Sequence, residues 1–318
     1  MFQTARSSDR SSSGDGFLGP KGQKSKSQIS GGWPQGDRRW REPDYNAGPS
    51  VEALNACVAN PHALTARAVA SARAEESERP DSLFSDPLAY RLAGAEGKGR
   101  GVSLVVQRTR FMDDFLYDAF DNGIRQVVLL GAGMDARAFR LGLYEMHFFE
   151  VDQATIFDVK EPLVADVPLQ AASRQWVAAR VEDHKLGDKL VAAGLDPQKP
   201  SAWILEGLMM YLSPDQTSRM MAQIGRVAAP RSAVVHESLS DRYLDSGISY
   251  CGAKFTGCSD DYDDLWACYA GFNRSEMIDF SSVSIDRRQR MLKLHGPPIS
   301  KSSIRGRVLM YFFTAWKI

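Results

Sequence analysis

Short apolar runs alternate with amphipathic stretches along the chain from about residue 126 onward. The runs are shorter than typical helices and are bounded by turn-forming residues, so they predict strands. We expect these strands at 126–130, 147–151, 176–181, 201–205, 233–236 and 308–316. Strands that alternate with helices form mainly parallel sheets covered on both faces, so the pattern predicts an α/β fold.

Helical patterns fill the region before the first strand and several of the gaps between strands. "ALTARAVASARAEES" is dense in Ala, and "GVSLVVQRTRFMDDFLYDAFDNG" repeats its apolar residues at helical spacing until Asn122-Gly123 ends it. After the fourth strand, "SPDQTSRMMAQIGRV" opens with a capping box of Ser213 and Gln216, and Pro214 takes the first helical position. We therefore expect N-terminal helices at 49–124 and a core of alternating elements at 125–237.

Two further segments differ in composition from this core. Residues 1–48 are rich in Ser, Gly, Lys and Arg and poor in aliphatic side chains, which predicts a disordered tail. The tail could also be an organelle transit peptide, although the missing apolar core excludes a secretory signal, and we expect a cytoplasmic protein. Residues 238–300 mix Tyr, Trp and Phe with acids, as in "CSDDYDDLWACYAGF". We interpret them as a lid that sets the choice of acceptor, with a solvated acidic face as the alternative, before a final strand at 301–318.

Charge and cysteine content exclude several classes of protein. The 39 basic and 39 acidic residues cancel, whereas nucleic-acid binders concentrate excess Lys and Arg on one face. No stretch approaches the roughly 18 uninterrupted apolar residues of a membrane span. The four cysteines form no C-x-x-C pair, so neither a zinc site nor a redox motif is indicated. We expect no metal, no nucleic acid and no membrane among the partners.

The first strand runs into a glycine turn in "VVLLGAGMDARAFRL", which is suited to a nucleoside cofactor. Gly131 and Gly133 allow a ligand to approach the backbone, and Asp152, 21 residues after Gly131, can accept hydrogen bonds from ribose hydroxyls. With Ala136 the turn also satisfies the dinucleotide fingerprint, so an NAD-dependent oxidoreductase remains an alternative. We place Asp135 in the first turn of the next helix, where its carboxylate either repels a pyrophosphate or merely caps the helix.

Four ordered motifs carry a family resemblance over roughly residues 63–229: "RTRFMDDFL", "LLGAGMDARAFRL", "FFEVDQ" and "ILEGLMMYLSPD". The chain resembles the leucine carboxyl methyltransferase family, including its bacterial branch of S-adenosylmethionine-dependent O-methyltransferases. The resemblance implies the class I methyltransferase sheet, a Rossmann-like arrangement with helices on both faces and a helical cap. It also implies S-adenosyl-L-methionine as cofactor, which has a sulfonium cation and no phosphate.

The resemblance also assigns residues to the cofactor. Arg108 would pair with the methionine carboxylate, with Arg110 as the competing assignment. The remaining cofactor residues that it implies are Gly131, Gly133, Asp152 and Glu206. The third strand departs from the family pattern of Asp-Leu, since "VAARVEDHKL" offers Arg180-Val181 or, one residue along, Glu182-Asp183, so the adenine contact stays open.

The predicted reaction is methyl transfer to an oxygen of a small molecule. A carboxylate acceptor is already ionised and needs no base, whereas a hydroxyl must lose a proton. His236 in "AVVHES", at the end of the fifth strand, is the candidate base, with a structural role as the alternative. Methylation of a protein C-terminal leucine carboxylate is a second hypothesis, and a non-catalytic relative that binds the cofactor without turnover is a third.

Overall fold

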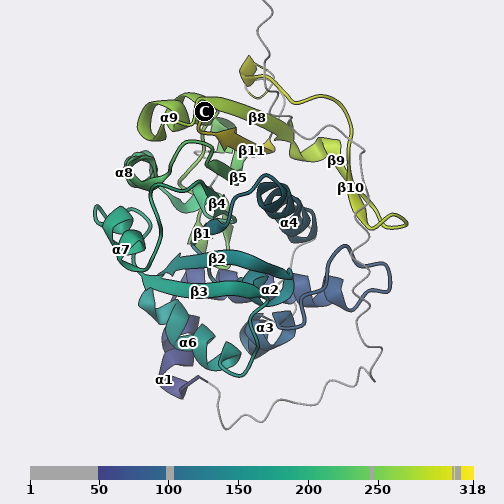
Figure 1. Cartoon of the computed structure of the whole chain (residues 1–318). Helices are drawn as coiled ribbons and strands as arrows, with labels where there is room; N and C mark the ends of the chain where they lie inside the picture. Colours follow the sequence, from purple (N-terminus) through teal and green to yellow (C-terminus); the bar gives the residue numbers. More distant parts are fainter. Residues whose placement is uncertain (1–48, 98–103, 244–246, 303, 305–308) are drawn as a thin grey trace, which may run out of the picture. The chain divides into compact units, whose positions relative to one another are not determined.

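The computed structural model describes residues 49–97, 104–243, 247–302, 304 and 309–318, all of which fall in one unit that spans 45–318. The predicted tail at 1–48 lies outside the described residues. The centre of this unit is a seven-stranded sheet in the order β3-β2-β1-β4-β5-β11-β8 (Figure 1). Its strands are β1 (Gln126–Leu130), β2 (Leu143–Asp152), β3 (Ala171–Ala178), β4 (Ser201–Leu205), β5 (Ala233–Leu239), β8 (Arg274–Asp279) and β11 (Met310–Trp316).

The sheet is parallel except for one strand. β1 pairs in parallel with β2 and β4, β2 with β3, and β4 with β5. β11 runs antiparallel between β5 and β8. The predicted mainly parallel α/β fold is therefore confirmed.

Helices cover both faces of the sheet, as Figure 1 shows for α4 on one side and α7 and α8 on the other. The helices are α1 (Val51–Ala59), α2 (Pro61–Ser77), α3 (Ala89–Gly97), α4 (Leu104–Asp121), α5 (Arg137–Arg140), α6 (Ala154–Val164), α7 (Leu186–Ala192), α8 (Pro214–Val227) and α9 (Tyr262–Ala270). The capping box of α8 forms as predicted: Ser213 Oγ accepts from Gln216 N–H, and Gln216 Oε1 accepts from Ser213 N–H. None of the described helices is long and apolar enough to cross a membrane.

Alternate residues of the central strands enter two different apolar clusters. In β1, Val127 and Leu129 pack in the cluster that contains Met112 of α4, whereas Val128 and Leu130 pack in the cluster that contains Met220 of α8. Successive side chains of a strand point to opposite faces, so a strand buried on both faces must be apolar throughout. This double burial explains why β1 and β4 had the predicted bounds.

Four predicted strands differ in their bounds from the observed ones: β2 and β5 are longer than the predicted 147–151 and 233–236, and β3 and β11 begin at other residues. β3 spans Ala171–Ala178 rather than 176–181, because it is an edge strand with much of its surface exposed and has a weak apolar pattern. The segment 238–300, which we interpreted as a lid, contributes β8 to the edge of the central sheet. It also contains two small hairpins, β6 (Ser249–Tyr250) with β7 (Ala253–Lys254) and β9 (Val283–Asp286) with β10 (Met291–Leu294). The predicted last strand began at residue 308, which lies outside the described residues, and β11 begins at Met310.

Candidate active site

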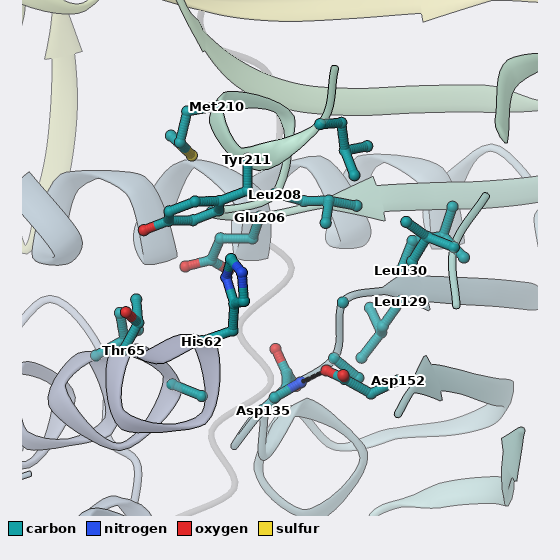
Figure 2. Close-up of a pocket in the computed structure, with 18 of the residues that line it drawn as sticks. His62, Thr65, Leu129, Leu130, Asp135, Asp152, Glu206, Leu208, Met210 and Tyr211 are labelled. Atoms are coloured by element: carbon teal, nitrogen blue, oxygen red, sulfur yellow. Dashed lines mark hydrogen bonds between the residues drawn. The ribbon is translucent and has the colours of Figure 1, made fainter. Parts of the chain in front are cut away.

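A pocket of about 430 Å³ lies at the carboxyl ends of β1, β2 and β4, where parallel sheets commonly bind ligands (Figure 2). Its walls come from the turns after these strands, from the first turns of α2 and from the segment after β3. All five cofactor residues predicted from the sequence line it, namely Arg108, Gly131, Gly133, Asp152 and Glu206. The fold therefore brings these residues together from α4, β2 and the turns after β1 and β4.

The glycine turn after β1 has a backbone that favours glycine. Gly131 and Gly133 have φ angles of +67° and +48°, in the left-handed region. A Cβ atom on Gly131 would lie 3.1 Å from Leu208 Cδ1, and one on Gly133 would lie 3.0 Å from Ala66 Cβ. The two glycines thus allow the turn to pack tightly beneath the pocket.

Asp152 at the end of β2 holds this turn in place. Its Oδ2 accepts a hydrogen bond of 2.8 Å from the N–H of Gly133, and its Oδ1 accepts one of 2.7 Å from the N–H of Gln153. Burial raises the pKa of Asp152, while these two backbone bonds oppose that rise. Each carboxylate oxygen can accept a second hydrogen bond, so Asp152 can still meet hydroxyl groups of a ligand.

Arg108 on α4 is buried between two carboxylates. Its Nε lies 3.1 Å from Glu206 Oε1, and its Nη1 lies 3.0 Å from Glu237 Oε1. Glu237 also accepts from the N–H of Gly207 at 2.6 Å, and burial raises its pKa despite Arg108. Arg110, the competing assignment, bonds to Asp114 and to the carbonyl of Leu83 and does not line the pocket.

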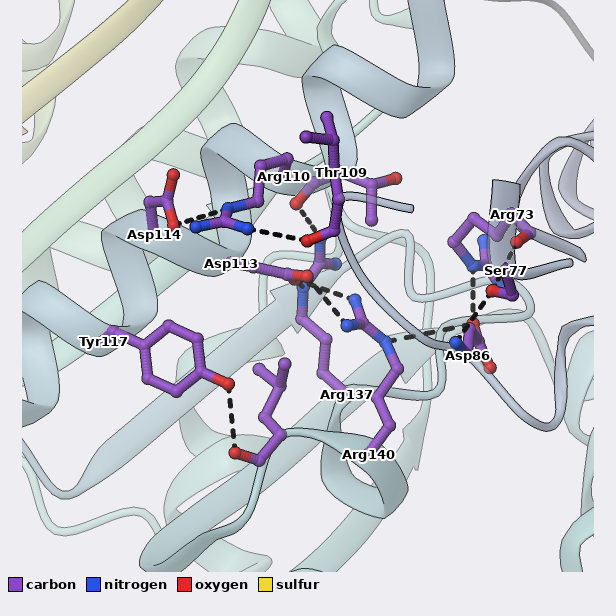
Figure 3. Close-up of polar contacts among 12 residues, drawn as sticks. Arg73, Ser77, Asp86, Thr109, Arg110, Asp113, Asp114, Tyr117, Arg137 and Arg140 are labelled. Atoms are coloured by element: carbon purple, nitrogen blue, oxygen red, sulfur yellow. Dashed lines mark hydrogen bonds and ion pairs between the residues drawn. The ribbon is translucent and has the colours of Figure 1, made fainter. Parts of the chain in front are cut away.

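Asp113, Arg137 and Arg140 form a network of buried charges (Figure 3), and Arg137 connects this network to Glu206. Arg137 Nη2 lies 2.6 Å from Glu206 Oε2, and Arg137 Nε lies 2.8 Å from Asp113 Oδ1. Asp113 also binds both terminal nitrogens of Arg140. Burial works against the ionised form of Glu206, but Arg137 and Arg108 more than offset it and lower its pKa. Glu206 is therefore a carboxylate at neutral pH.

Asp135 does not lie where the sequence placed it. It precedes α5, a helix of four residues, and its Oδ1 accepts the N–H of Arg137 at 2.7 Å while its Oδ2 pairs with the Arg137 side chain. The positive charge of Arg137 lowers the pKa of Asp135 although burial opposes this. A pyrophosphate needs free N–H groups at a helix start, and here an ionised carboxylate occupies that N–H. The structure therefore supports the argument against a dinucleotide, by a different geometry.

The residues that follow β3, where the sequence left the adenine contact open, differ in whether they line the pocket. Ala179, Arg180, Val181 and Glu182 follow the end of β3 and line the pocket. Asp183 instead pairs with Lys189 at 2.7 Å and is not part of the lining. Glu182 Oε1 accepts from Arg180 and from Gln216. Of these two acids, Glu182 is therefore the one in the lining of the pocket.

Comparisons with known proteins agree with this geometry. The model of the leucine carboxyl methyltransferase family matches residues 66–225, half of the chain. This chain belongs to the leucine carboxyl methyltransferase family. Three of its relatives each have the name "Putative S-adenosyl-L-methionine-dependent methyltransferase".

The relatives come from actinobacteria. The Mycolicibacterium smegmatis protein is 33% identical over 64% of this chain and 75% of its own length. The Parafrankia relative is 37% identical over 54% of this chain and 62% of its own length, and the Streptomyces coelicolor relative is 39% identical over 53% and 66%. The chain thus spans somewhat less than two thirds of the Parafrankia and Streptomyces relatives and three quarters of the Mycolicibacterium one. The family offers no support for the NAD-dependent oxidoreductase alternative.

The pocket fits the cofactor named in these relatives. Arg108 Nη2 makes no hydrogen bond within the described part of the chain, so this nitrogen can donate to a carboxylate. Glu206 presents a negative charge beside it, which suits an ammonium group, and the oxygens of Asp152 have capacity left to accept hydrogen bonds from sugar hydroxyls. The described residues contain no group of His, Cys, Asp and Glu that could hold a metal ion.

His236 does not reach the pocket, which corrects its assignment as the base. It is fully buried in β5, where its Nε2 accepts from Trp266 Nε1 at 3.0 Å and its Nδ1 lies 2.8 Å from Ser238 Oγ. It also stacks on Phe313 with ring centroids 4.7 Å apart. Burial lowers the pKa of His236 to about 3, so the ring stays neutral and structural.

Two residues that the structure brings to the site were not predicted from the sequence. Glu237, next to His236 in β5, points to the opposite face and binds Arg108; strict alternation along a strand could have found it. His62 lies in the first turn of α2 and lines the pocket, although its sequence context gave no such signal. Its position depends on the packing of α2 over the glycine turn, which a sequence pattern does not contain.

Proposed function

We propose that this protein is an S-adenosylmethionine-dependent O-methyltransferase that acts on a small molecule. The observation that carries the proposal is the composition of one continuous pocket. Charged side chains, among them Arg108, Glu206 and Asp152, line one part of the pocket. Mainly apolar side chains line the part around Met210 and Tyr211. A charged cofactor and a less polar acceptor could thus lie side by side in it.

The residues of this chain have separate tasks in this reaction. When bound, S-adenosylmethionine supplies a methyl group that is activated by the positive sulfur. Arg108 and Glu206 would bind the amino-acid end of the cofactor, and Asp152 would bind its sugar. Methyl transfer is accelerated mainly by holding the reacting groups in line and close together, so the walls of the pocket contribute by orientation and by excluding water.

A second candidate function comes from the family name. Carboxyl methylation of a protein C-terminal leucine remains a prediction, favoured by the matched family model. The described lining of the pocket disfavours it, because Arg73, Arg137 and Arg180 already have carboxylate partners in Asp86, Asp113 and Glu182, and the free nitrogen of Arg108 is assigned to the cofactor. A cytoplasmic location also remains a prediction.

The proposal is tested by titrating the full chain with S-adenosylhomocysteine and, in parallel, with NAD in a calorimeter. We expect saturable binding of S-adenosylhomocysteine and no heat from NAD. Binding of NAD, or no binding of S-adenosylhomocysteine, would contradict the proposal. Incubation with trideuteromethyl-labelled cofactor and a mixture of small phenols, alcohols and acids, followed by mass spectrometry, then identifies the class of atom that receives the methyl group.

A further inference from the structure

The pocket is mainly apolar at the end away from Asp152. The side chains there come from the 3₁₀ turn η2 (Met209–Tyr211), the end of β5, the hairpin β6–β7 and β11. They are Met210, Tyr211, Leu239, Ile248, Tyr250, Phe255 and Met310. Figure 2 shows Met210 and Tyr211 on the far side of the pocket from Asp135 and Asp152. We call these seven residues the apolar wall.

None of the seven side chains of the apolar wall is a cation, and the charge of Arg108 reaches Tyr211 and Tyr250 from the neighbouring charged end of the pocket. Arg108 is already held between Glu206 and Glu237, so an acceptor carboxylate placed against the wall would lose its contact with water without gaining a full counter-charge from the protein, which is costly. An uncharged molecule has no such cost and gains from burial of its apolar surface. The wall therefore selects against acids and for neutral molecules.

Aromatic rings in the wall hold each other at defined angles. Tyr211 packs edge-on against Phe255 with ring centroids 5.3 Å apart and an interplanar angle of 77°. The main chain of Tyr211 is fixed as well, because its carbonyl accepts a hydrogen bond of 3.1 Å from Thr256 Oγ1. Such pairs favour a flat aromatic guest, which can add a further edge-to-face or stacked contact.

His62 lies between the apolar wall and the charged end of the pocket. Its ring meets Tyr211 edge-on, with centroids 5.1 Å apart, and Figure 2 shows it pointing into the pocket between Glu206 and Asp152. The Asn60 side chain caps α2 by accepting the His62 N–H at 3.0 Å, which fixes the backbone from which the ring projects. His62 is thus at the junction where the acceptor must meet the cofactor.

Other groups near this junction are poor proton acceptors. Burial raises the pKa of Tyr211 and of Tyr250 to about 12, so both phenols stay protonated at neutral pH. Glu206 is held as a weakly basic carboxylate by two arginines. Histidine is the side chain that most often removes protons in enzymes near neutral pH. Among the histidines of the described chain, His62 is the one in the lining.

We propose that the acceptor is an uncharged aromatic molecule with a phenolic hydroxyl group, and that His62 removes the proton of that hydroxyl. This inference rests on the proposed function. The hydroxyl oxygen forms a bond to the methyl carbon as the carbon–sulfur bond breaks, sulfur keeps the electron pair, and the proton passes to a ring nitrogen of His62. A phenol is the favourable hydroxyl for this, because its proton is far more acidic than that of an alkyl alcohol.

The first test compares two probes of matched size and shape, 2-naphthol and 2-naphthoate, which differ in charge. Each is titrated into the full chain saturated with S-adenosylhomocysteine. We expect 2-naphthol to bind at least about tenfold more tightly, the ratio that 1.4 kcal/mol of desolvation penalty produces. Equal or tighter binding of 2-naphthoate, or no binding of 2-naphthol, would overturn the inference.

The second test isolates His62 with the variant His62→Gln and the control His147→Gln. His147 is an exposed histidine at the start of the paired part of β2, outside the pocket lining. We expect His62→Gln to slow methylation of 2-naphthol by about 100-fold or more, the usual contribution of a general base. The affinities for S-adenosylhomocysteine and 2-naphthol should change less than about threefold, and the control should match the wild type. A loss of cofactor affinity in His62→Gln would instead assign His62 to the cofactor and overturn its role as base.

A third readout does not depend on turnover. 4-Nitrophenol is bound to the chain saturated with S-adenosylhomocysteine, at a pH where the free compound is protonated. We expect the yellow phenolate band with the wild type and with His147→Gln, and its loss with His62→Gln. Absence of the band from the wild type would contradict proton transfer to His62. If S-adenosylhomocysteine itself fails to bind, the proposed function falls; if it binds but the acid probe is preferred, only the acceptor inference falls.

Discussion

The two ends of the pocket are built by opposite means. Around Arg108 and Glu206, ionised side chains are buried in a network in which almost every charge has a partner of opposite sign. Around Tyr211 and Phe255, the lining consists mainly of apolar and aromatic side chains. The difference indicates that one end recognises a fixed set of charges, whereas the other selects by shape and neutrality.

The charged end of the pocket recognises its ligand specifically, but it is sensitive to substitution. Buried charges are costly to leave without a partner, so each of them depends on the others. The apolar end has no such dependence, because a lost apolar contact costs only the surface that it buried. Substitutions at the two ends should therefore have effects of different size and on different ligands.

The largest effect is expected for Arg108→Met, which leaves Glu237 buried with no cation beside it. The free energy of unfolding should fall by about 3–5 kcal/mol at pH 8, as for other broken buried ion pairs. Burial already raises the pKa of Glu237 in the folded state, so its penalty is small when it is protonated and grows as the pH rises. The loss should therefore be smaller at pH 5, as measured by urea unfolding.

The double variant Arg108→Met with Glu237→Gln is the matched control for this effect. Gln can still accept the N–H of Gly207, which Glu237 binds at 2.6 Å, without a buried charge. We expect it to restore much of the lost stability at pH 8 and little at pH 5. No recovery at pH 8 would show that Arg108 is not paired with Glu237.

The next largest effect is the loss of cofactor binding in Asp152→Ala. The variant removes the sugar acceptor and leaves the N–H groups of Gly133 and Gln153 without their partner. The affinity for S-adenosylhomocysteine should fall by at least about 100-fold, because bonds to charged groups contribute about 1.5–3 kcal/mol each. Asp183→Ala, which removes an acid that faces Lys189, should bind normally in the same calorimetric titration. Unchanged affinity in Asp152→Ala would remove this acid from the cofactor site.

A smaller effect is expected for His236→Phe, which keeps the stacking on Phe313 but leaves Trp266 Nε1 without its acceptor. Stability at pH 7 should fall by about 1–3 kcal/mol, the cost of an unpaired buried donor. Because burial lowers the pKa of His236 to about 3, its unfolded form takes up a proton below about pH 6.5 and the wild type loses stability as the pH falls. The gap between variant and wild type should thus narrow at pH 5, and a large loss of turnover in a folded variant would restore His236 as the base.

The smallest effect is expected at the apolar end, for Phe255→Ala. Removing the Phe255 ring from the apolar wall should weaken binding of 2-naphthol by about tenfold, because the ring no longer covers apolar area of the ligand. The affinity for S-adenosylhomocysteine should stay within about threefold of the wild type. An equal loss for both ligands, measured by titration, would mean that the two ends of the pocket do not act separately.

The sequence predicted the central strands well and the edges poorly. β1 and β4 lie between two covered faces, so their apolar runs are uninterrupted and their bounds are sharp. β3 lies at the edge and includes polar residues such as Arg174, which pairs with Glu150 of β2, so its position was misjudged. β8 was missed because its pairing with β11 joins segments far apart in the chain.

The residues of the site were also predicted only where they lie close together in the sequence or match a family motif. Gly131, Gly133 and Asp152 were predicted because strand, turn and next strand are close in sequence and have a recognisable spacing. His62 was missed and His236 was misassigned, because a side chain's face on its strand and the packing of a distant helix decide which histidine meets the pocket. Family resemblance supplied Arg108 and Glu206, whereas their partner Glu237 could be found only in the structure.

A crystal structure of the full chain grown with S-adenosylhomocysteine would locate the cofactor directly. We expect the ligand in this pocket, with its sugar hydroxyls on Asp152 and its amino-acid end between Arg108 and Glu206. Density for the ligand elsewhere on the protein, or a crystal in which the pocket binds the pyrophosphate of NAD instead, would contradict this expectation.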